Sequence, residues 1–317
     1  MKHLVIVNPK SFPKKAKMES VIFDIKVYFD SVSADYLVYV SRYPRDAMSV
    51  VKKYIQETDE IVRVYSVGGD GMTFDCLNGM MGFANAELAV IPYGTSNDFV
   101  RAFGENKAHI FRDIEKQATA GTILTDVISI GARSILNFAS AGVEAGAVLK
   151  FFEVSQKHPG IAHVLGKSLY TACAPLAILD KRITYQKYEI TIDGVNYDGN
   201  YASINIANSA CYGGDKNAVI MAHPADGFFD IILTKSVSSL RLFSVILDYT
   251  KGNYYRYPSV FTHVRGKEVS IRSSSPLQLN TDGESYYDER LDAKIVPNAV
   301  KIVAPDNLQY VTRRELA

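Results

Sequence analysis

Apolar runs alternate with amphipathic segments over the first 130 residues of the chain. Four runs of apolar and β-branched residues, at 4–7, 35–40, 61–67 and 88–91, predict buried strands. Between the second and third runs, apolar residues recur at i, i+3, i+4, i+7 and i+8 over residues 47–55, which predicts an amphipathic helix. An alternation of strands and helices indicates a parallel sheet with helices on its faces.

The same alternation continues to residue 130. We expect helices over 72–81, 99–103 and 111–121, the last of them ending at Gly121. A strand over 123–130 follows.

The pattern changes near residue 128. Helices are expected near 143–154 and 164–180, and short alternating runs of apolar and polar residues follow. Asp193-Gly194 is a strong hairpin signal between two of these runs. Many short strands with few helices indicate a β-sandwich or a barrel. The strands are expected at 182–193, 197–208, 228–234, 268–272, 277–281 and 300–303.

Length and pattern together divide the chain into two domains. Its 317 residues exceed what one hydrophobic core usually serves. We expect an α/β domain at 1–127, rejoined by a C-terminal tail from about 300 to 317, and a β-rich domain at 128–299.

Composition limits the class of protein. A hydrophobic content of 47% and a charged content of 22% are ordinary for a soluble globular protein, and the net charge of +1 gives no reason to expect a nucleic-acid partner. Three scattered cysteines without metal-binding spacing indicate reduced thiols in a cytoplasmic protein. No run approaches the roughly twenty apolar residues of a membrane span, so a lipid substrate would be met at the membrane surface.

A glycine-rich turn follows the strand at 61–67. Gly68-Gly69-Asp70-Gly71 stands between that strand and the next helix. Glycines bring backbone N–H groups close to an anion, and a helix N-terminus adds its dipole, so the stretch is typical of a phosphate-binding turn. Asp70 fits such a turn if a divalent cation lies between carboxylate and phosphate. An ordinary left-handed turn, where Gly and Asp are common, is the alternative.

A second turn of this kind follows the strand at 88–91. The stretch Pro92-Tyr93-Gly94-Thr95-Ser96-Asn97-Asp98-Phe99 supplies a glycine, a hydroxyl, an amide and a carboxylate just before a helix. Ligands of parallel sheets bind beyond the carboxyl ends of the strands. Both turns lie at such ends, so we expect them to converge on one crevice.

Three further acidic residues are candidates for the site, each with a structural alternative. Asp126 lies inside an apolar strand, where a carboxylate is costly unless it is paired; it could equally hydrogen-bond to neighbouring backbone. Asp282 and Glu284 flank Gly283 near the end of the chain, where an ordinary hairpin turn is the alternative.

The two glycine turns resemble the catalytic domain of the diacylglycerol kinase family. That family includes the bacterial YegS-like lipid kinases and the sphingosine and ceramide kinases; NAD kinases share only the GGDG part. Asn8-Pro9, Thr125-Asp126 and Asp282-Gly283-Glu284 match weaker parts of the family pattern, so the resemblance spans nearly the whole chain.

The resemblance implies a fold, an activity and a set of site residues. It implies an α/β nucleotide-binding domain of the NAD kinase and diacylglycerol kinase type, a C-terminal β-sandwich domain, and a cleft between them. It also implies ATP and Mg²⁺ as cofactors, with a water-bridged magnesium network at Asp70, Asp98 and Asp126. Asp282 and Glu284 are the candidates for proton removal from the acceptor hydroxyl. The ATP-binding residues it implies are Asn8, Gly68, Gly69, Asp70, Gly71, Gly94, Thr95 and Asn97.

The chain departs from the family in the helix after GGDG. The usual continuation is Thr, then Leu or Ile, Asn and Glu, whereas here it is Met72, Thr73, Phe74 and Asp75. Met72 removes a hydroxyl near the phosphates, and Phe74 replaces an amide.

Two other departures lie in loops. In relatives, a glycine usually follows the serine in the turn after the first strand, whereas this chain has Phe12 at that position. Relatives also carry a longer P-D-A-x-x-x-D-G segment that helps to hold a structural magnesium ion, where this chain has only 223–227. The shorter loop puts that second metal site in doubt.

A group of lysines begins the first helix. Lys14, Lys15 and Lys17 fit a solvated basic face, or alternatively contact with ATP phosphates or with an anionic bilayer.

The function we expect is phosphoryl transfer from Mg²⁺–ATP to a lipid hydroxyl, diacylglycerol or a related lipid. One alternative is a kinase of a soluble substrate, as NAD kinases are. Another is a catalytically impaired lipid- or nucleotide-binding homologue, which Met72 and Phe74 would explain. The sequence specifies neither the acceptor nor the oligomeric state; a homodimer is the commonest closed assembly.

Overall fold

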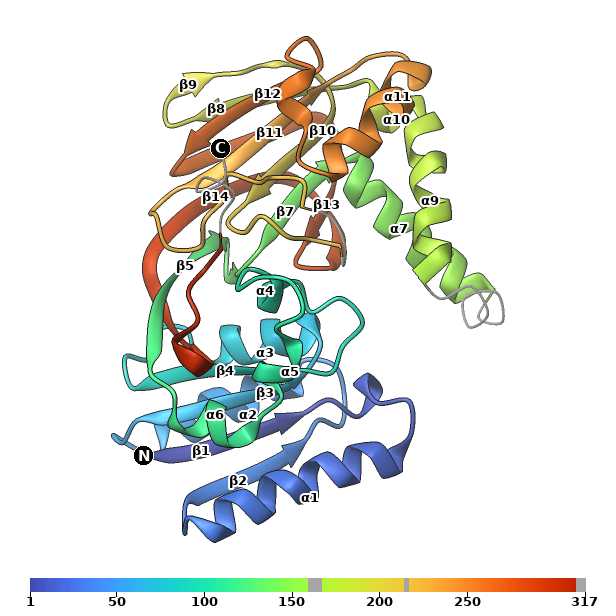
Figure 1. The fold of residues 1–317 in the computed structure, drawn as a ribbon. Coiled ribbons are helices and arrows are strands. Elements are labelled where there is room, and N and C mark those ends of the chain that lie inside the picture. The colour runs from blue at the N-terminus through green and yellow to red at the C-terminus, as the bar shows by residue number, and fades with distance from the viewer. Residues whose placement is uncertain (159–166, 214–216, 312–317) are drawn as a thin grey trace.

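A parallel sheet with helices on both faces forms the N-terminal half of the molecule. The computed structural model describes residues 1–158, 167–213 and 217–311 (Figure 1). Successive parallel strands run in the order β4, β3, β1, β2, so the carboxyl ends of all four lie at one edge. The strands are β1 (Lys2–Val7), β2 (Asp35–Val40), β3 (Val62–Gly68) and β4 (Ala86–Pro92).

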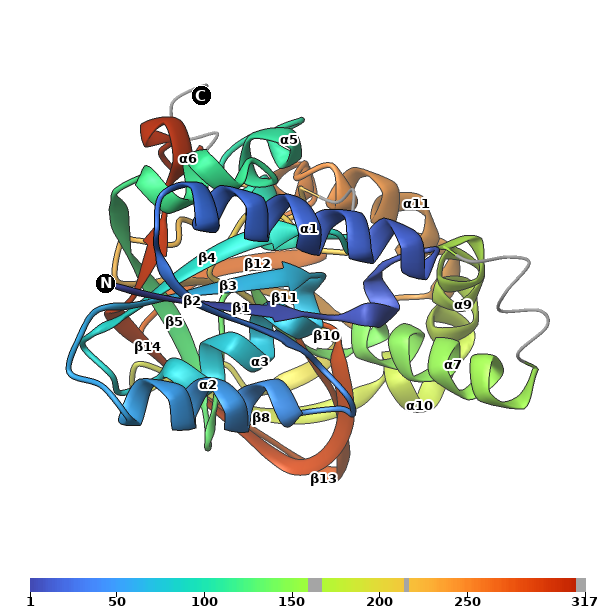
Figure 2. The ribbon, with the colours of Figure 1, turned by 90° about the horizontal axis from the view of Figure 1, so that it is seen from below.

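Helices cover the two faces of this sheet (Figure 2). α1 (Lys15–Ser31) lies on one face, and α2 (Asp46–Gln56) and α3 (Asp70–Met80) lie on the other. The predicted amphipathic helix over 47–55 is confirmed, because Ala47, Val51 and Ile55 are buried. Each face therefore has its own apolar core.

The segment after β4 corrects one predicted helix. The helix predicted over 99–103 is α4 (Asp98–Arg101), and in place of one helix over 111–121 the chain forms α5 (Ala108–Phe111) and α6 (Ile114–Thr119). Asp113 ends the preceding turn and starts α6, because its side chain accepts a hydrogen bond from the N–H of Lys116. The chain is already extended at Ala120, so Gly121 does not cap the helix.

The C-terminal half is mainly β-structure with three longer helices. The short helix α10 replaces the start of the strand predicted at 182–193, because the Asp180 side chain accepts a hydrogen bond from the N–H of Arg182 and caps the helix. The helices are α7 (Val143–Lys157), α9 (Lys167–Leu179), α10 (Lys181–Thr184) and α11 (Ser239–Thr250). The strands are β6 (Arg133–Ile135), β7 (Phe138–Gly142), β8 (Gln186–Ile192), β9 (Val195–Asn196), β10 (Gly199–Ala207), β11 (Phe229–Lys235), β12 (Phe261–Gly266) and β13 (Glu268–Thr281). Short 3₁₀ turns lie at η1 (Pro9–Ser11), η2 (Tyr254–Arg256) and η3 (Pro305–Asn307).

The β-rich half closes on itself around a core. β7 and β8 each pair with both β10 and β13, so these four strands enclose apolar side chains. The predicted hairpin at Asp193-Gly194 is confirmed between β8 and β9, and both of its residues have positive φ. The α/β plus β fold class expected from the sequence is therefore confirmed.

Two long strands connect the halves. β5 (Thr122–Ile130) pairs antiparallel with the second half of β14 (Glu284–Val303), and the end of β14 also adds to β4 in parallel. β14 is 20 residues long, whereas the sequence suggested only 300–303. The runs predicted at 268–272 and 277–281 are one strand, β13, with a break in register between Arg272 and Leu277.

The predicted domain limits fall inside these connecting strands. The limit between 127 and 128 lies within β5, and the limit between 299 and 300 lies within β14. We retain the division as a proposal. The last part of the predicted tail, 312–317, lies outside the described residues.

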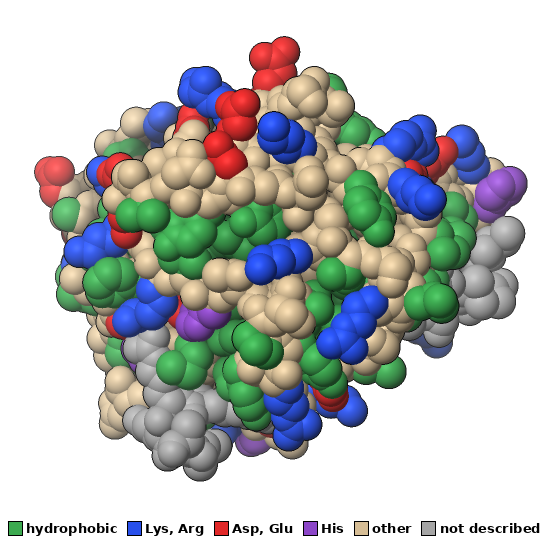
Figure 3. Space-filling model, turned by 90° about the horizontal axis from the view of Figure 1, so that it is seen from above, with side chains coloured by type: hydrophobic (Ala, Val, Ile, Leu, Met, Phe, Trp, Pro, Cys, Tyr) green, Lys and Arg blue, Asp and Glu red, His purple; other side chains and the backbone are tan. Residues whose placement is uncertain are grey.

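Neither α11 nor β12 was predicted from the sequence pattern. α11 buries Leu242, Val245 and Tyr249 and leaves Leu240 and Leu247 exposed to 83% and 69%. Seen from the β-rich end, hydrophobic side chains are scattered among Lys and Arg (Figure 3). Among the residues described, no helix is long and apolar enough to cross a membrane.

Candidate active site

The two glycine turns touch each other at the edge of the parallel sheet. The N–H groups of Tyr93 and Gly94 both donate to the carbonyl of Gly68, at 2.7 and 3.0 Å. A Cβ added to Gly94 would lie 2.2 Å from the Cα of Gly69, so only glycine permits this approach. A Cβ on Gly71 would meet nothing within 4 Å, so this glycine borders open space at the start of α3. The predicted convergence of the turns is confirmed.

The Asp70 carboxylate joins the two turns. Asp70 is the first residue of α3, and its two oxygens accept the N–H groups of Asn97 (2.9 Å) and Asp98 (2.8 Å). Asn97 has a left-handed backbone (φ 52°), and its side chain both accepts from Gly94 N–H and donates to Gly94 C=O. Asp70 and Asn97 therefore fix the second turn against the first.

Three carboxylates lie close enough to affect one another. Burial, together with the negative charges of Asp98 and Asp282, raises the pKa of Asp70 to about 7. Asp98 also accepts a hydrogen bond from the N–H of Gly213 at 2.7 Å, which brings a loop of the β-rich half to the site. A group of carboxylates that repel one another is the donor set expected around a cation.

Asp282 sits in the hairpin between β13 and β14. Its carboxylate accepts the N–H groups of Leu136, Asn137 and Phe138 at 2.8–3.3 Å, and its own N–H donates to Phe138 C=O. Burial raises the pKa of Asp282 to about 6 although these hydrogen bonds lower it. The hairpin alternative is therefore correct as far as backbone shape goes, with φ of 46° at Asp282 and 90° at Gly283.

Asp126 takes the structural role that the sequence left open. Its oxygens accept the N–H groups of Gly227 (2.7 Å) and Asn298 (2.8 Å), and its own N–H donates to Pro224 C=O. Across the described ranges, no group of three or more His, Cys, Asp or Glu side chains could hold a metal ion directly. The structure thus brings Asp70 and Asp98 together and engages Asp126 with backbone, so the three-residue magnesium network is not assembled by direct contact.

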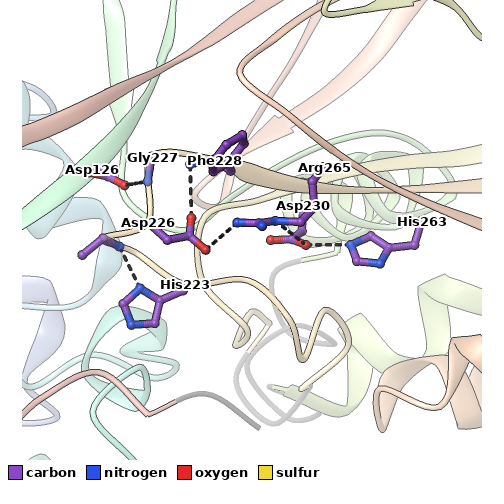
Figure 4. Close-up of polar contacts among 9 residues, drawn as sticks. Asp126, His223, Asp226, Gly227, Phe228, Asp230, His263 and Arg265 are labelled. Carbon is purple, nitrogen blue, oxygen red and sulfur yellow. Dashed lines mark hydrogen bonds and ion pairs between the residues drawn. The ribbon is translucent and has the colours of Figure 1, made fainter. Parts of the chain in front are cut away.

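A second polar cluster lies beyond Asp126, in the shortened loop at 223–227 (Figure 4). Arg265 of β12 donates to Asp226 at 2.7 Å and lies 3.7 Å from the buried Asp230, which also contacts His263 at 2.6 Å. The Arg265 guanidinium therefore places a positive charge between Asp226 of this loop and Asp230 of β11. Because Arg265 already pairs with Asp226, the donors present do not fit a structural magnesium ion here.

Asn8 and Thr95 border the glycine turns. A Cβ added to Gly68 would lie 3.1 Å from the Cβ of Asn8. The Asn8 side chain accepts a hydrogen bond from the N–H of Lys10. Thr95 is exposed and lines a cavity of about 640 Å³. Both halves of the molecule line this cavity, which agrees with the predicted cleft: Gly94, Thr95, Asn97, Arg101, Cys211 and Asn217.

The side chains that differ from the family pattern after GGDG are buried and do not point into the open space beside Gly71. Met72 is 4% exposed and packs near Gly68, while the Thr73 hydroxyl contacts Ser66 at 3.1 Å in the interior. Thr73 therefore does not replace the hydroxyl that Met72 removes. Phe74 is 3% exposed, with a guanidinium over its ring.

That guanidinium belongs to Arg45, which the sequence reasoning missed. Arg45 lies 2.6 Å from Asp75, 2.8 Å from Glu284 and 4.5 Å from the centre of the Phe74 ring. No local pattern marks it, because its partners are about 30 and 240 residues away in sequence. The lysines at the start of α1 are exposed, and Lys15 pairs with Glu19 within the helix.

The residues present fit ATP and magnesium at the glycine turns. Asp70 and Asp98 supply oxygen donors of the kind Mg²⁺ prefers, next to backbone that side chains do not cover. Their mutual repulsion with Asp282 would be relieved by a divalent ion. Such an ion, when bound, neutralises phosphate charge.

Two family models match the chain, and together they span most of its length. Residues 2–130 match the diacylglycerol kinase catalytic domain. Residues 141–304 match the YegS C-terminal domain, described as NAD kinase β-sandwich-like. The second match alone covers more than half of the chain.

Known proteins agree with these matches. Proteins named “Putative lipid kinase” from Staphylococcus aureus strains JH9 and Newman are each 26% identical over 251 residues, covering 77% of this chain and 78% of theirs. A structure titled as a “putative diacylglycerol kinase” from Bacillus anthracis str. Sterne superposes with a TM-score of 0.75 at 23% identity, over 97% of this chain and 96% of that chain. A second, titled as a diacylglycerol kinase from the same organism, gives 0.69 at 19% identity, over 97% and 98%. At such identity these structures establish the shared fold, and the family matches establish descent: the chain belongs to the diacylglycerol kinase and YegS-like family of lipid kinases.

Proposed function

We propose that this protein transfers the γ-phosphoryl group of Mg²⁺–ATP to a hydroxyl of a lipid, diacylglycerol or a closely related one. The observation that supports this most is the contact between the two glycine turns, with Asp70 accepting N–H groups from the second turn. Phosphoryl transfer depends on positioning and on charge neutralisation more than on covalent chemistry by the protein. The geometry of the turns offers both.

Each predicted residue then has a role. Backbone at Gly68, Gly69, Gly71 and Gly94 would approach the phosphates, with Asn8, Thr95 and Asn97 at the border of the nucleotide. Asp70 and Asp98 would hold Mg²⁺, directly or through water. Asp126 would support them by fixing β5 to the loop at 223–227.

Asp282 is a better candidate than Glu284 for the base. Its carboxylate lies with Asp70 and Asp98, and its raised pKa, about 6, suits proton uptake near neutral pH. Glu284 instead pairs with Arg45 at 2.8 Å. Asp282→Asn should therefore lower kcat by on the order of 10²–10⁴-fold. Steady-state rates of Asp282→Asn and Glu284→Gln test this: near-native turnover of Asp282→Asn would remove Asp282 from the role.

A panel of acceptors tests the proposed function. Purified protein is incubated with Mg²⁺–ATP and mixed micelles that hold diacylglycerol, monoacylglycerol, phosphatidylglycerol or a sphingoid base, and the products are identified by mass spectrometry. NAD and a soluble diol serve as the matched soluble acceptors. Phosphorylation of a lipid alone supports the proposal, whereas phosphorylation of a soluble acceptor alone contradicts it.

A catalytically impaired homologue is the second candidate, and the helix after GGDG favours it. Met72 places a buried apolar side chain where relatives have a hydroxyl, and the Thr73 hydroxyl points to Ser66. ATP binding without turnover on any acceptor would support this reading. Gain of transfer in Met72→Thr combined with Phe74→Asn would then show that these two positions are the cause.

The substrate also bears on where the protein works. A lipid acceptor would be met at a membrane surface, so we propose a cytoplasmic protein that binds the bilayer peripherally. The exposed lysines at the start of α1 are one source of attraction to anionic lipid.

A further inference from the structure

Arg45 bridges two walls of the site. One of its terminal nitrogens lies 2.6 Å from Asp75 in α3, and the other lies 2.8 Å from Glu284 at the start of β14. Its guanidinium also lies over the ring of Phe74. A planar guanidinium with several donors suits this double pairing better than an ammonium does.

The backbone of Arg45 is unusual for its residue type. It has φ of 69° and ψ of 1°, a left-handed conformation that side chains other than Asn and Asp rarely adopt. Such conformations persist where surrounding contacts fix them, and they gather at functional sites. Here the two carboxylates and the ring supply those contacts.

Both partners of Arg45 lie near carboxylates of the site in the sequence. Asp75 follows Asp70 in the same helix, by five residues. Glu284 follows Asp282 by two residues, across Gly283. Arg45 therefore connects the helix that carries Asp70 to the hairpin that carries Asp282.

This bridge also accounts for two departures from the family pattern. Phe74 supplies the ring beneath the guanidinium, and Asp75 supplies a carboxylate whose side chain is only 11% exposed. Both residues stand in α3 where relatives carry Asn and Glu. Phe74 and Asp75 thus both contact the Arg45 guanidinium.

We propose that Arg45 is a positioning residue that holds the Asp282–Glu284 hairpin against α3 and so fixes the spacing between Asp282 and Asp70. In this role Glu284 acts as the partner of Arg45 and takes no proton from the acceptor. The inference rests on the proposed kinase function for its effect on turnover, but the structural contact itself does not depend on any activity.

Two variants of Arg45 separate the contact from the backbone strain. Arg45→Gly and Arg45→Ala both remove the guanidinium, but glycine relaxes the left-handed backbone and alanine does not. Arg42→Ala is the matched control, because Arg42 belongs to the same loop, is exposed and has its guanidinium over Tyr39. Arg45→Lys tests whether an ammonium group, in place of the guanidinium, can hold both carboxylates.

Turnover is the first readout. We expect Arg45→Gly and Arg45→Ala to lose about tenfold to a hundredfold in kcat, since small displacements of reacting groups cost this much, with the KM for ATP changed less than threefold. Arg45→Gly should be the more stable of the two yet no more active. Adding Glu284→Ala to Arg45→Gly should cause no further loss. A loss that follows stability, or a full additional loss in the double variant, would overturn the proposal.

Hydrogen exchange is the second readout and needs no activity. Amides over 281–287 should exchange faster in Arg45→Gly than in the native protein, and at the native rate in Arg42→Ala. Unchanged exchange over 281–287 in Arg45→Gly would overturn the proposal even if the protein proved to be a kinase. Faster exchange with no transfer by the native protein on any acceptor would uphold the contact and refute the proposed function.

Discussion

Single residues decide whether the two glycine turns can meet. Gly94 and Gly69 approach so closely that no side chain fits between them, whereas Gly71 faces open space. The same motif therefore contains glycines needed for packing and a glycine that leaves room for a ligand. The two kinds respond differently to one added methyl group.

Gly94→Ala and Gly71→Ala form a matched pair. Gly94→Ala should destabilise the protein by about 1–3 kcal/mol, because its methyl group would meet the backbone of Gly69. Gly71→Ala should leave stability within about 1 kcal/mol, since alanine favours helix, while weakening ATP binding. Urea unfolding and calorimetric ATP titration measure the two effects. Equal stability of the two variants would contradict the packing argument.

His3 provides a pH-dependent contribution to stability. Its ring is 9% exposed, contacts Tyr65 at 2.8 Å, and has its pKa lowered to about 4, first by burial and then by Arg63. The unfolded chain takes up this proton near pH 6.5 and the folded protein only near pH 4. Stability should therefore fall as pH drops from 6.5 to 4, by up to about 3 kcal/mol at 1.36 kcal/mol per pKa unit.

His3→Gln isolates that contribution. Other groups titrate in the same range, so the useful quantity is the difference in unfolding free energy between native protein and variant at pH 7 and at pH 4.5. The native protein should lose more stability than the variant over this interval. Parallel pH profiles would show that His3 is not buried in its neutral form.

At the scale of elements, charged side chains of neighbouring strands hold a short loop in place. The loop at 223–227 is fixed on one side by Asp126 of β5 and on the other by Arg265 of β12. His263 and Arg265 are two residues apart in β12 and both reach the buried Asp230. Side chains of one strand thus take the place of an added metal ion.

Removing divalent metal should therefore not affect the folding of this half. Excess EDTA should leave the urea midpoint unchanged, whereas Arg265→Met should lower stability by about 2 kcal/mol, because buried acceptors lose a charged partner. Arg290→Met is the control, since Arg290 forms an exposed pair with Asp292 and its loss should cost less than about 1 kcal/mol. A midpoint lowered by EDTA would reveal a structural metal that this account excludes.

For the whole molecule, sequence patterns predicted the elements that depend on nearby residues and missed the features that depend on pairing between distant segments. The glycine turns, the parallel strands and the hairpin at Asp193-Gly194 each depend on residues adjacent in sequence, and all are present. The length of β14 and the joining of β13 depend on pairing with strands far away along the chain. Such pairing leaves no local signal, so these strands were predicted as short separate pieces.

The site divides in the same way. Asp70 and Asn97 were found because both belong to recognisable turns. Arg45 and Arg265 were missed because their partners are brought near only by the fold. Asp126 was placed correctly in a strand, but its backbone partners at Gly227 and Asn298 are far away in sequence and could not be predicted.

The proposed function requires the joined glycine turns to bind Mg²⁺–ATP and to direct its γ-phosphoryl group to a lipid. Transfer of radiolabelled γ-phosphate to diacylglycerol in mixed micelles, compared between the native protein and Asp70→Asn, tests it most directly. Asp70→Asn keeps the shape of the side chain but removes its charge. We predict label in the lipid with the native protein and at least a hundredfold less with the variant. Equal labelling by the two proteins would contradict the account.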